Sequence, residues 1–161
     1  MSLPGALQVF HGRVHDSLSR LMAHCRSLAE EELNRELEGF GYPTVRWQLH
    51  HLISAQKYWI GVLQGRIDAE EDDHLYPTVR HLEAYRSVVF EATEAWLQGV
   101  TEKELQTTRP MLTWSGKEKD LTPVHVFYRT QTHVFHHQGQ VLAMCRSMGR
   151  PGTAGMDYPV G

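Results

Sequence analysis

The chain has 161 residues, which is enough for one domain of ordinary size and too few for two. Hydrophobic residues make up 41% and charged residues 22%, a composition that excludes a disordered chain and indicates a buried core. The formal net charge of −3 argues against a protein that grips nucleic-acid phosphates. No apolar stretch approaches the roughly 20 residues that a membrane-spanning helix needs. We therefore expect neither a nucleic-acid nor a membrane partner.

Cysteine and histidine usage bears on location and metal binding. Cys25 and Cys145 are too few for a disulfide framework and lie among apolar residues, so we expect two reduced core thiols. The first residues lack the basic and apolar segments of a secretory signal, and we expect a cytoplasmic location. Eleven histidines are many for this length, and neutral imidazole is a common ligand of transition metals.

Apolar residues recur at steps of three and four along four stretches, which is the period of amphipathic helices. The predicted helices cover about residues 6–28, 44–64, 78–98 and 122–148. Thr44 and Thr78 are suited to cap helix starts, and Gly65 and Gly149 are suited to end helices. The expected fold class is therefore all-α, well above the usual helix content.

The connections between these helices are unequal in length. Residues 30–43 and 99–121 are long enough to cross an end of a bundle. Within the second connection, residues 101–104 have the spacing of a capping box, and residues 107–121 have room for a small hairpin. Thr122 before Pro123 predicts a hydroxyl cap for the last helix, and residues 150–161 predict an extended tail. We expect one four-helix-bundle domain over residues 1–161, with long crossover connections.

The last predicted helix carries a pair of histidines with metal-ligand spacing. His133 and His137 are four residues apart, so they project from one helix face about 6 Å apart along the axis. Two imidazoles at that separation can bind one ion. Eleven histidines are enough for such a pair to arise by chance, and His11 with His15 has the same spacing. Spacing alone therefore leaves the location of a site open.

A third ligand is available on the second predicted helix, where His50 and His51 are adjacent. Adjacent helix residues point about 100° apart, so only one of them can face the last helix. Ala55 and Tyr58 continue the helix face of His51, which favours His51. Three histidines from two helices would leave one coordination position for water or a substrate atom, as catalytic metal sites require.

These two segments resemble the DinB/YfiT family of bacterial four-helix-bundle metalloproteins. The resemblance covers most of the chain and rests on residues 51–59 together with His133, His137, Gly139 and Gln140. It implies that His51, His133 and His137 bind a divalent metal, commonly zinc or nickel in that family. One departure is Gln138, because many relatives carry Arg there and this chain lacks that basic side chain.

The resemblance implies a metal site more directly than a reaction. Relatives include S-transferases and isomerases that use low-molecular-weight thiols such as bacillithiol or mycothiol. An open metal position could bind a thiol, lower its pKa and hold the thiolate against an electrophile. The same position could instead activate water for hydrolysis, or the metal could only join two helices of a non-catalytic interaction module. No residue stands out from the sequence as catalytic.

Several other side chains carry expectations that a structure can test. At least two of the four tryptophans should lie in the core, and Trp114 would line a pocket if its loop covers the metal. Gly139 should permit a close helix approach, whereas Glu94, like Glu83 and Glu91, should be solvated. Relatives often form homodimers, and surplus apolar residues on the last helix favour one here: Phe127, Val134, Phe135 and Leu142.

Overall fold

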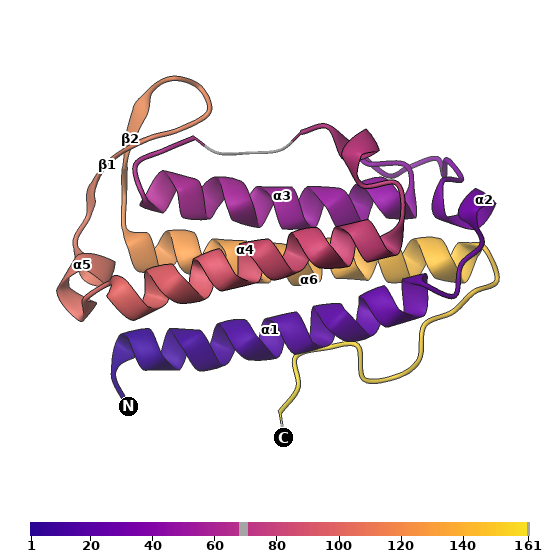
Figure 1. The fold of residues 1–161 in the computed structure, drawn as a ribbon, viewed down its shortest axis with the longest axis horizontal. Helices are drawn as coiled ribbons and strands as arrows, with labels where there is room; N and C mark the ends of the chain where they lie inside the picture. Colours follow the sequence, from indigo (N-terminus) through magenta and orange to yellow (C-terminus); the bar gives the residue numbers. More distant parts are fainter. Residues whose placement is uncertain (68–70, 161) are drawn as a thin grey trace.

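Four long helices lie side by side along most of their length in the computed structural model, which describes residues 1–67 and 71–160 (Figure 1). They are α1 (Leu3–Cys25), α3 (Val45–Leu63), α4 (Val79–Gly99) and α6 (Pro123–Ser147). The short elements are α2 (Glu30–Leu33), the 3-10 turn η1 (Asp73–Leu75), α5 (Glu102–Gln106), β1 (Arg109–Leu112) and β2 (Glu118–Leu121). The prediction of an all-α fold is confirmed. None of the helices in these described ranges is both long and apolar enough to cross a membrane.

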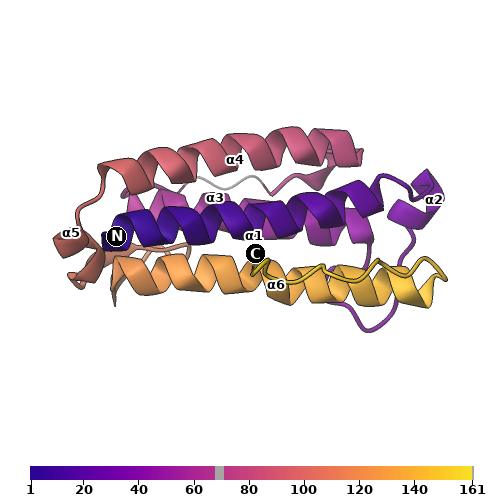
Figure 2. The same ribbon diagram turned by 90° about the horizontal axis from the view of Figure 1, so that it is seen from below.

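The order of the helices around the bundle explains the two long connections. α3 packs against α6 and α4, and α1 packs against α4 and α6, so α1 and α3 lie at opposite corners (Figure 2). The chain must therefore cross an end of the bundle between α1 and α3, and again between α4 and α6. α1 and α6 run in one direction while α3 and α4 run in the other (Figure 1). α3 and α6 are thus antiparallel neighbours, which brings residues distant in sequence face to face.

Local capping chemistry sets most helix ends. The Thr44 hydroxyl accepts the N–H of Trp47 at 3.0 Å, and Gly65 and Gly149 follow their helices with φ of 76° each, a backbone conformation that glycine adopts without strain. α1 begins at Leu3 rather than near residue 6, because Ser2 caps it by accepting the N–H of Gly5 at 3.3 Å. It also ends at Cys25 rather than near residue 28.

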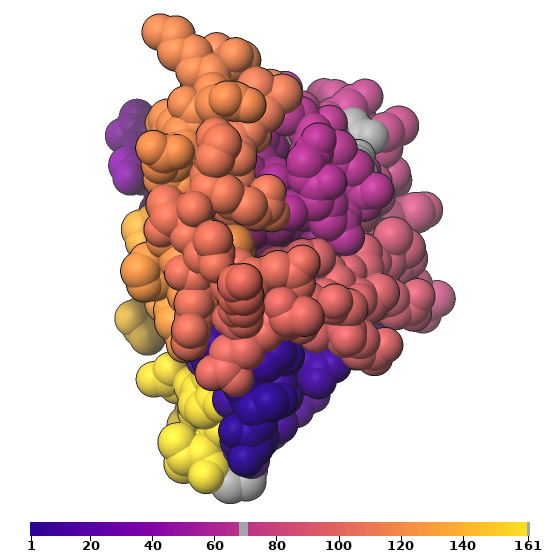
Figure 3. Space-filling model, turned by 90° about the vertical axis from the view of Figure 1, so that its left-hand side faces the viewer, coloured from indigo at the N-terminus to yellow at the C-terminus, as the bar shows by residue number. Residues whose placement is uncertain are grey.

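The predicted hydroxyl cap at Thr122 is wrong. Its side chain makes no capping bond to α6 and instead lies 2.7 Å from the hydroxyl of Thr108, which faces it across the open end of the hairpin. The capping box at Thr101 and Glu104 is confirmed and starts α5. The small hairpin is also present, with Arg109 opposite Leu121, and it rises above the end of α3 (Figure 3).

Leucine, valine and methionine side chains, rather than tryptophans, fill the centre of the bundle. Cys25 and Cys145 are both free and buried there, as predicted. The expectation of at least two core tryptophans is wrong, because none of the four is buried; Trp47 is 39% and Trp114 is 55% exposed. The indole N–H favours positions where one edge of the ring can reach a polar partner or water.

The tail after α6 covers much of the apolar surface from which we expected a homodimer. Phe127 and Val134 are fully buried within the bundle. Phe135 packs against Tyr158 of the tail, with ring centroids 6.5 Å apart, and Leu142 lies against the tail at Gly152. These residues therefore supply no argument for a second copy, and the homodimer stays a prediction.

Candidate metal centre

Antiparallel packing of α3 and α6 brings together the side chains of His51, His133 and His137, which we call the histidine cluster. The ligand nitrogens of the three imidazoles all lie within 4.8 Å of one another. The Nε2 atoms of His51 and His133 are 3.2 Å apart. Two nitrogens bound to one tetrahedral ion at about 2.0–2.1 Å are separated by about 3.3 Å, so this spacing fits a shared metal. The neighbouring His50 is buried elsewhere, beside the rings of Tyr76 and Tyr85.

A buried glutamine fixes the orientation of His137. The Nδ1–H of His137 donates to Oε1 of Gln48 at 2.6 Å, which leaves the Nε2 lone pair for an ion. The amide nitrogen of Gln48 donates in turn to the carbonyl of Tyr42 at 2.9 Å and to Oε1 of Gln140 at 2.7 Å. Gln140 then donates to Nε2 of the exposed His136 at 3.0 Å. His136 itself does not belong to the cluster.

Burial keeps the cluster neutral. It lowers the pKa of His51 to about 4, with smaller contributions from His133, His50 and His136. The pKa of His133 falls to about 4 through burial and the positive charge of Arg129, and that of His137 to about 3 through burial and the other imidazoles. Neutral imidazoles present the lone pairs that a metal ion requires.

A cavity of about 330 Å³ opens beside the cluster and is lined in part by His51 and His133. We call it the histidine cavity. Its aromatic walls are Tyr42, Tyr58, Trp59 and Trp114. The backbone N–H of Trp114 donates to Oη of Tyr58 at 2.8 Å, which ties the hairpin turn to α3 over this cavity. The expectation that Trp114 lines a pocket is confirmed.

Three polar residues at the site were not predicted from the sequence. Gln48 precedes His51 by three residues and Arg129 precedes His133 by four, so helical spacing alone puts each on the face of its histidine. Glu71 also lines the histidine cavity, although it lies in the connection between α3 and α4. No helical period applies to that connection, so the sequence held no signal for Glu71.

The alternative pair, His11 and His15, forms part of a buried hydrogen-bond network rather than a metal site. Gln56 lies between them, donating to Nε2 of His11 and accepting from Nε2 of His15, both at 3.0 Å. Nδ1 of His11 donates to Glu94 at 2.7 Å, so the expectation of a solvated Glu94 is wrong. Nδ1 of His15 accepts from Arg86 at 3.3 Å. All four imidazole nitrogens therefore have protein partners.

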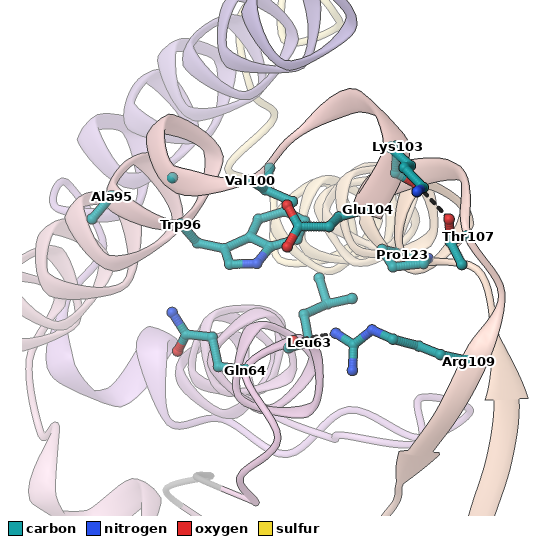
Figure 4. A pocket seen from close by; sticks show the side chains of 11 residues that line it. Leu63, Gln64, Ala95, Trp96, Val100, Lys103, Glu104, Thr107, Arg109 and Pro123 are labelled. Atoms are coloured by element: carbon teal, nitrogen blue, oxygen red, sulfur yellow. Dashed lines mark hydrogen bonds between the residues drawn. The ribbon is translucent and has the colours of Figure 1, made fainter.

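Two other features, a larger cavity and a second group of possible ligands, are weaker candidates for a metal centre than the histidine cluster. A larger cavity of about 880 Å³ lies by α5, where Arg109 reaches across to donate to the carbonyl of Leu63 at 2.7 Å (Figure 4). Leu63 is twelve residues beyond His51, which is about 18 Å along α3. A second group of ligand types, Asp72, Asp73 and His74, is largely exposed, and Asp73 pairs with Arg46 at 2.7 Å.

Comparison with known proteins identifies the family to which this architecture belongs. A model of the DinB family matches residues 9–160. The chain belongs to the DinB family. Its fold is similar to that of a DinB-like protein from Bacillus cereus ATCC 10987, at 20% identity and a TM-score of 0.69, covering 94% of this chain and 97% of the other. A conserved protein from Enterococcus faecalis is similar at 14% identity and a TM-score of 0.65, covering 91% and 96%. Among curated proteins, no match is found.

Gln138 and Gly139 lie in the α6 segment that resembles the DinB family, but they belong to the fold and not to the histidine cluster. Gln138 is buried, and its amide donates to the hydroxyl of Ser17 at 2.9 Å and to the carbonyl of Met156 at 2.6 Å, which ties the tail to the bundle. Gly139 is exposed, and an added Cβ would meet no neighbouring atom within 4 Å. The expectation of a close helix approach at Gly139 is therefore wrong.

Proposed function

We propose that His51, His133 and His137 bind a divalent metal, zinc or nickel, and that this DinB protein is a thiol-dependent S-transferase or isomerase. One observation carries the proposal: three neutral imidazoles converge at the edge of a cavity. Within the described residues, no fourth His, Cys, Asp or Glu joins the cluster. A structural zinc site would have a complete set of four protein ligands, whereas a catalytic site keeps one position open.

A bound ion would offer that open position to a thiol and lower the thiol's pKa. The residues around it have separate tasks. Gln48 holds the imidazole of His137 in one tautomer, and the ring of Tyr42 stacks on His51 with centroids 4.0 Å apart. Trp59 and Trp114 line the histidine cavity and limit the access of water to a reactive sulfur.

Hydrolysis is the second candidate, because Glu71 lines the same cavity. A carboxylate there is suited to take a proton from an attacking water. The two reactions differ in their requirement for thiol. We expect transfer of a thiol to 1-chloro-2,4-dinitrobenzene, and no thiol-free turnover of 4-nitrophenyl acetate above that of metal-free protein. Thiol-free ester hydrolysis that Glu71→Gln abolishes would support the hydrolase instead.

Elemental analysis tests the metal site directly. Wild-type protein purified without a nickel column should contain close to one metal ion per chain, and His137→Ala should lose it. His125→Ala is the matched control, since His125 is exposed on the same helix and outside the cluster. Equal metal content in wild type and His137→Ala would contradict the proposal.

We also propose that the protein is a homodimer, as relatives of this kind often are. Light scattering coupled to size-exclusion chromatography should then give twice the chain mass of 18.5 kDa. A mass of one chain across the tested concentrations would rule this assembly out.

A further inference from the structure

The histidine cavity contains a guanidinium group that lies close to the cluster. Arg129 lies one helical turn before His133 on α6 and lines the cavity. Its guanidinium sits over the ring of Trp59, 5.1 Å from the ring centroid. The contribution of Arg129 to the lowered pKa of His133 agrees with this closeness.

Arg129 forms no ion pair within residues 1–67 and 71–160. A guanidinium positioned over an aromatic face keeps its N–H donors available, and these match the two oxygens of a carboxylate. Arg129 is exposed, but its contact with Trp59 restrains the side chain, so less rotamer freedom is lost when a ligand binds than for an arginine without such a contact. Arg129 is therefore arranged to accept an anionic group from inside the cavity.

The charges around the cavity favour the same kind of ligand. A divalent ion among three neutral imidazoles brings two positive charges, and Arg129 brings a third. Glu71 is the one carboxylate among the described residues that line the cavity. The remaining excess of positive charge is matched by a ligand that carries both a thiolate and a carboxylate.

We propose that the thiol bound by this site carries a carboxylate, and that Arg129 selects it. The inference rests on the proposed thiol function. Arg129 and His133 both line the histidine cavity and are neighbours on one helix face, with Cβ atoms about 5–6 Å apart, so one ligand inside the cavity can reach both the ion and the guanidinium. Short mercaptocarboxylates meet this requirement, whereas uncharged thiols of the same length leave Arg129 without a partner.

Cobalt(II)-loaded protein allows the test without any turnover, because sulfur-to-cobalt absorption reports thiolate binding. We would titrate it with 3-mercaptopropionate and with 3-mercaptopropionamide, which have the same length and differ in charge. Wild type should bind the acid about tenfold more tightly, the effect of roughly one charge-assisted hydrogen-bonded pair. Arg129→Gln should reduce the preference below about twofold, and Arg129→Lys should keep part of it.

Arg146→Gln is the matched control, because Arg146 is exposed near the far end of α6 and its loss changes the net charge equally. It should keep the wild-type preference. Cobalt content and circular dichroism of each variant would exclude unfolding as a cause.

The outcomes separate this inference from the thiol function. If Arg129→Gln retains the full preference, the acid's carboxylate chelates the ion directly, and the role of Arg129 is overturned. If both thiols give the absorption with equal affinity in wild type, the inference fails while the thiol function stands. If neither thiol gives it, the thiol function fails and this inference fails with it.

Discussion

The amide oxygen of Gln48 accepts the Nδ1–H of His137 at 2.6 Å, linking α3 to α6 at the base of the histidine cluster. Both side chains are buried. The carbonyl of Tyr42 and the amide of Gln140 accept the two donor bonds of Gln48, so the amide cannot flip without losing three hydrogen bonds. Such a partner sets the tautomer and direction of a histidine that binds metal.

Replacing Gln48 with leucine should therefore weaken metal binding while the cluster itself is intact. Loss of a hydrogen-bond partner of this kind typically costs about 10- to 100-fold in metal affinity. The Kd for zinc, measured by competition with a chromophoric chelator, is the readout. Gln98→Leu, at an exposed position of α4, should leave the Kd unchanged. Equal Kd values in wild type and Gln48→Leu would show that the bond does not support the site.

Metal binding should also appear as stability, because an ion that binds only the folded chain shifts the unfolding equilibrium. Free zinc at about 100 times its Kd should raise the free energy of unfolding by about 2.7 kcal/mol. Urea unfolding with and without zinc measures the difference. His133→Ala should abolish the zinc effect, and calcium, which prefers oxygen ligands, should have none in wild type. A zinc effect of the same size in His133→Ala would point to binding elsewhere.

Much of the fold follows from local sequence signals, whereas the site follows from them only in part. Helical periodicity and caps such as Thr44 and Gly149 act over a few residues, so helix positions could be predicted to within several residues. The spacing of His133 and His137 is equally local. The contact of His137 with Gln48 depends on which face α3 turns toward α6, and that is set by packing of the whole bundle.

The prediction of two core tryptophans is wrong for a different reason. Hydrophobicity and size favour the core for Trp59, but the sequence does not show that the bundle leaves a cavity beside the cluster for its ring to line. Glu71 illustrates the same limit, because the path of its connection depends on where α3 and α4 pack.

The exposed helical position of Gly139 predicts a gain in stability on substitution. An alanine Cβ there meets no neighbouring atom within 4 Å, and alanine restricts the unfolded chain more than glycine does. Gly139→Ala should raise the free energy of unfolding by about 0.5–1 kcal/mol. Urea denaturation measures it, and an unchanged or lower midpoint would contradict the expectation.

Gly149 is the opposite case, although it also has open space around its Cα. Its φ of 76° ends α6 in the left-handed region, where a side chain clashes with its own backbone. Gly149→Ala should lower the free energy of unfolding by about 1 kcal/mol. The same urea assay applies, and stabilisation by this substitution would show that the helix end can rearrange.

The buried network of His11 and His15 predicts that stability falls in mild acid. Burial lowers the pKa of His15 well below its ordinary value of 6.5, and His11 and Arg86 add to the effect. Burial also lowers the pKa of His11, although Glu94 opposes this. In the unfolded chain both histidines regain a pKa near 6.5, so below that pH the unfolded state binds protons that the folded state does not. The stabilisation is fully present above pH 6.5 and is lost as the pH falls below it.

Each such histidine should reduce the free energy of unfolding by about 1 kcal/mol between about pH 7.5 and 5.5. In metal-free protein, the lowered pKa values of the histidine cluster also reduce stability as the pH falls. The contribution of His15 is therefore measured as the difference between His15→Leu and wild type. In the presence of EDTA, His15→Leu should lose about 1 kcal/mol less than wild type over this interval, whatever its stability at pH 7.5. His125→Leu, at an exposed position of α6, should follow wild type. An equal loss of stability in His15→Leu and wild type over this interval would contradict the prediction. It would mean that His15 has the same protonation in the folded and unfolded chains, despite its burial between α1, α3 and α4.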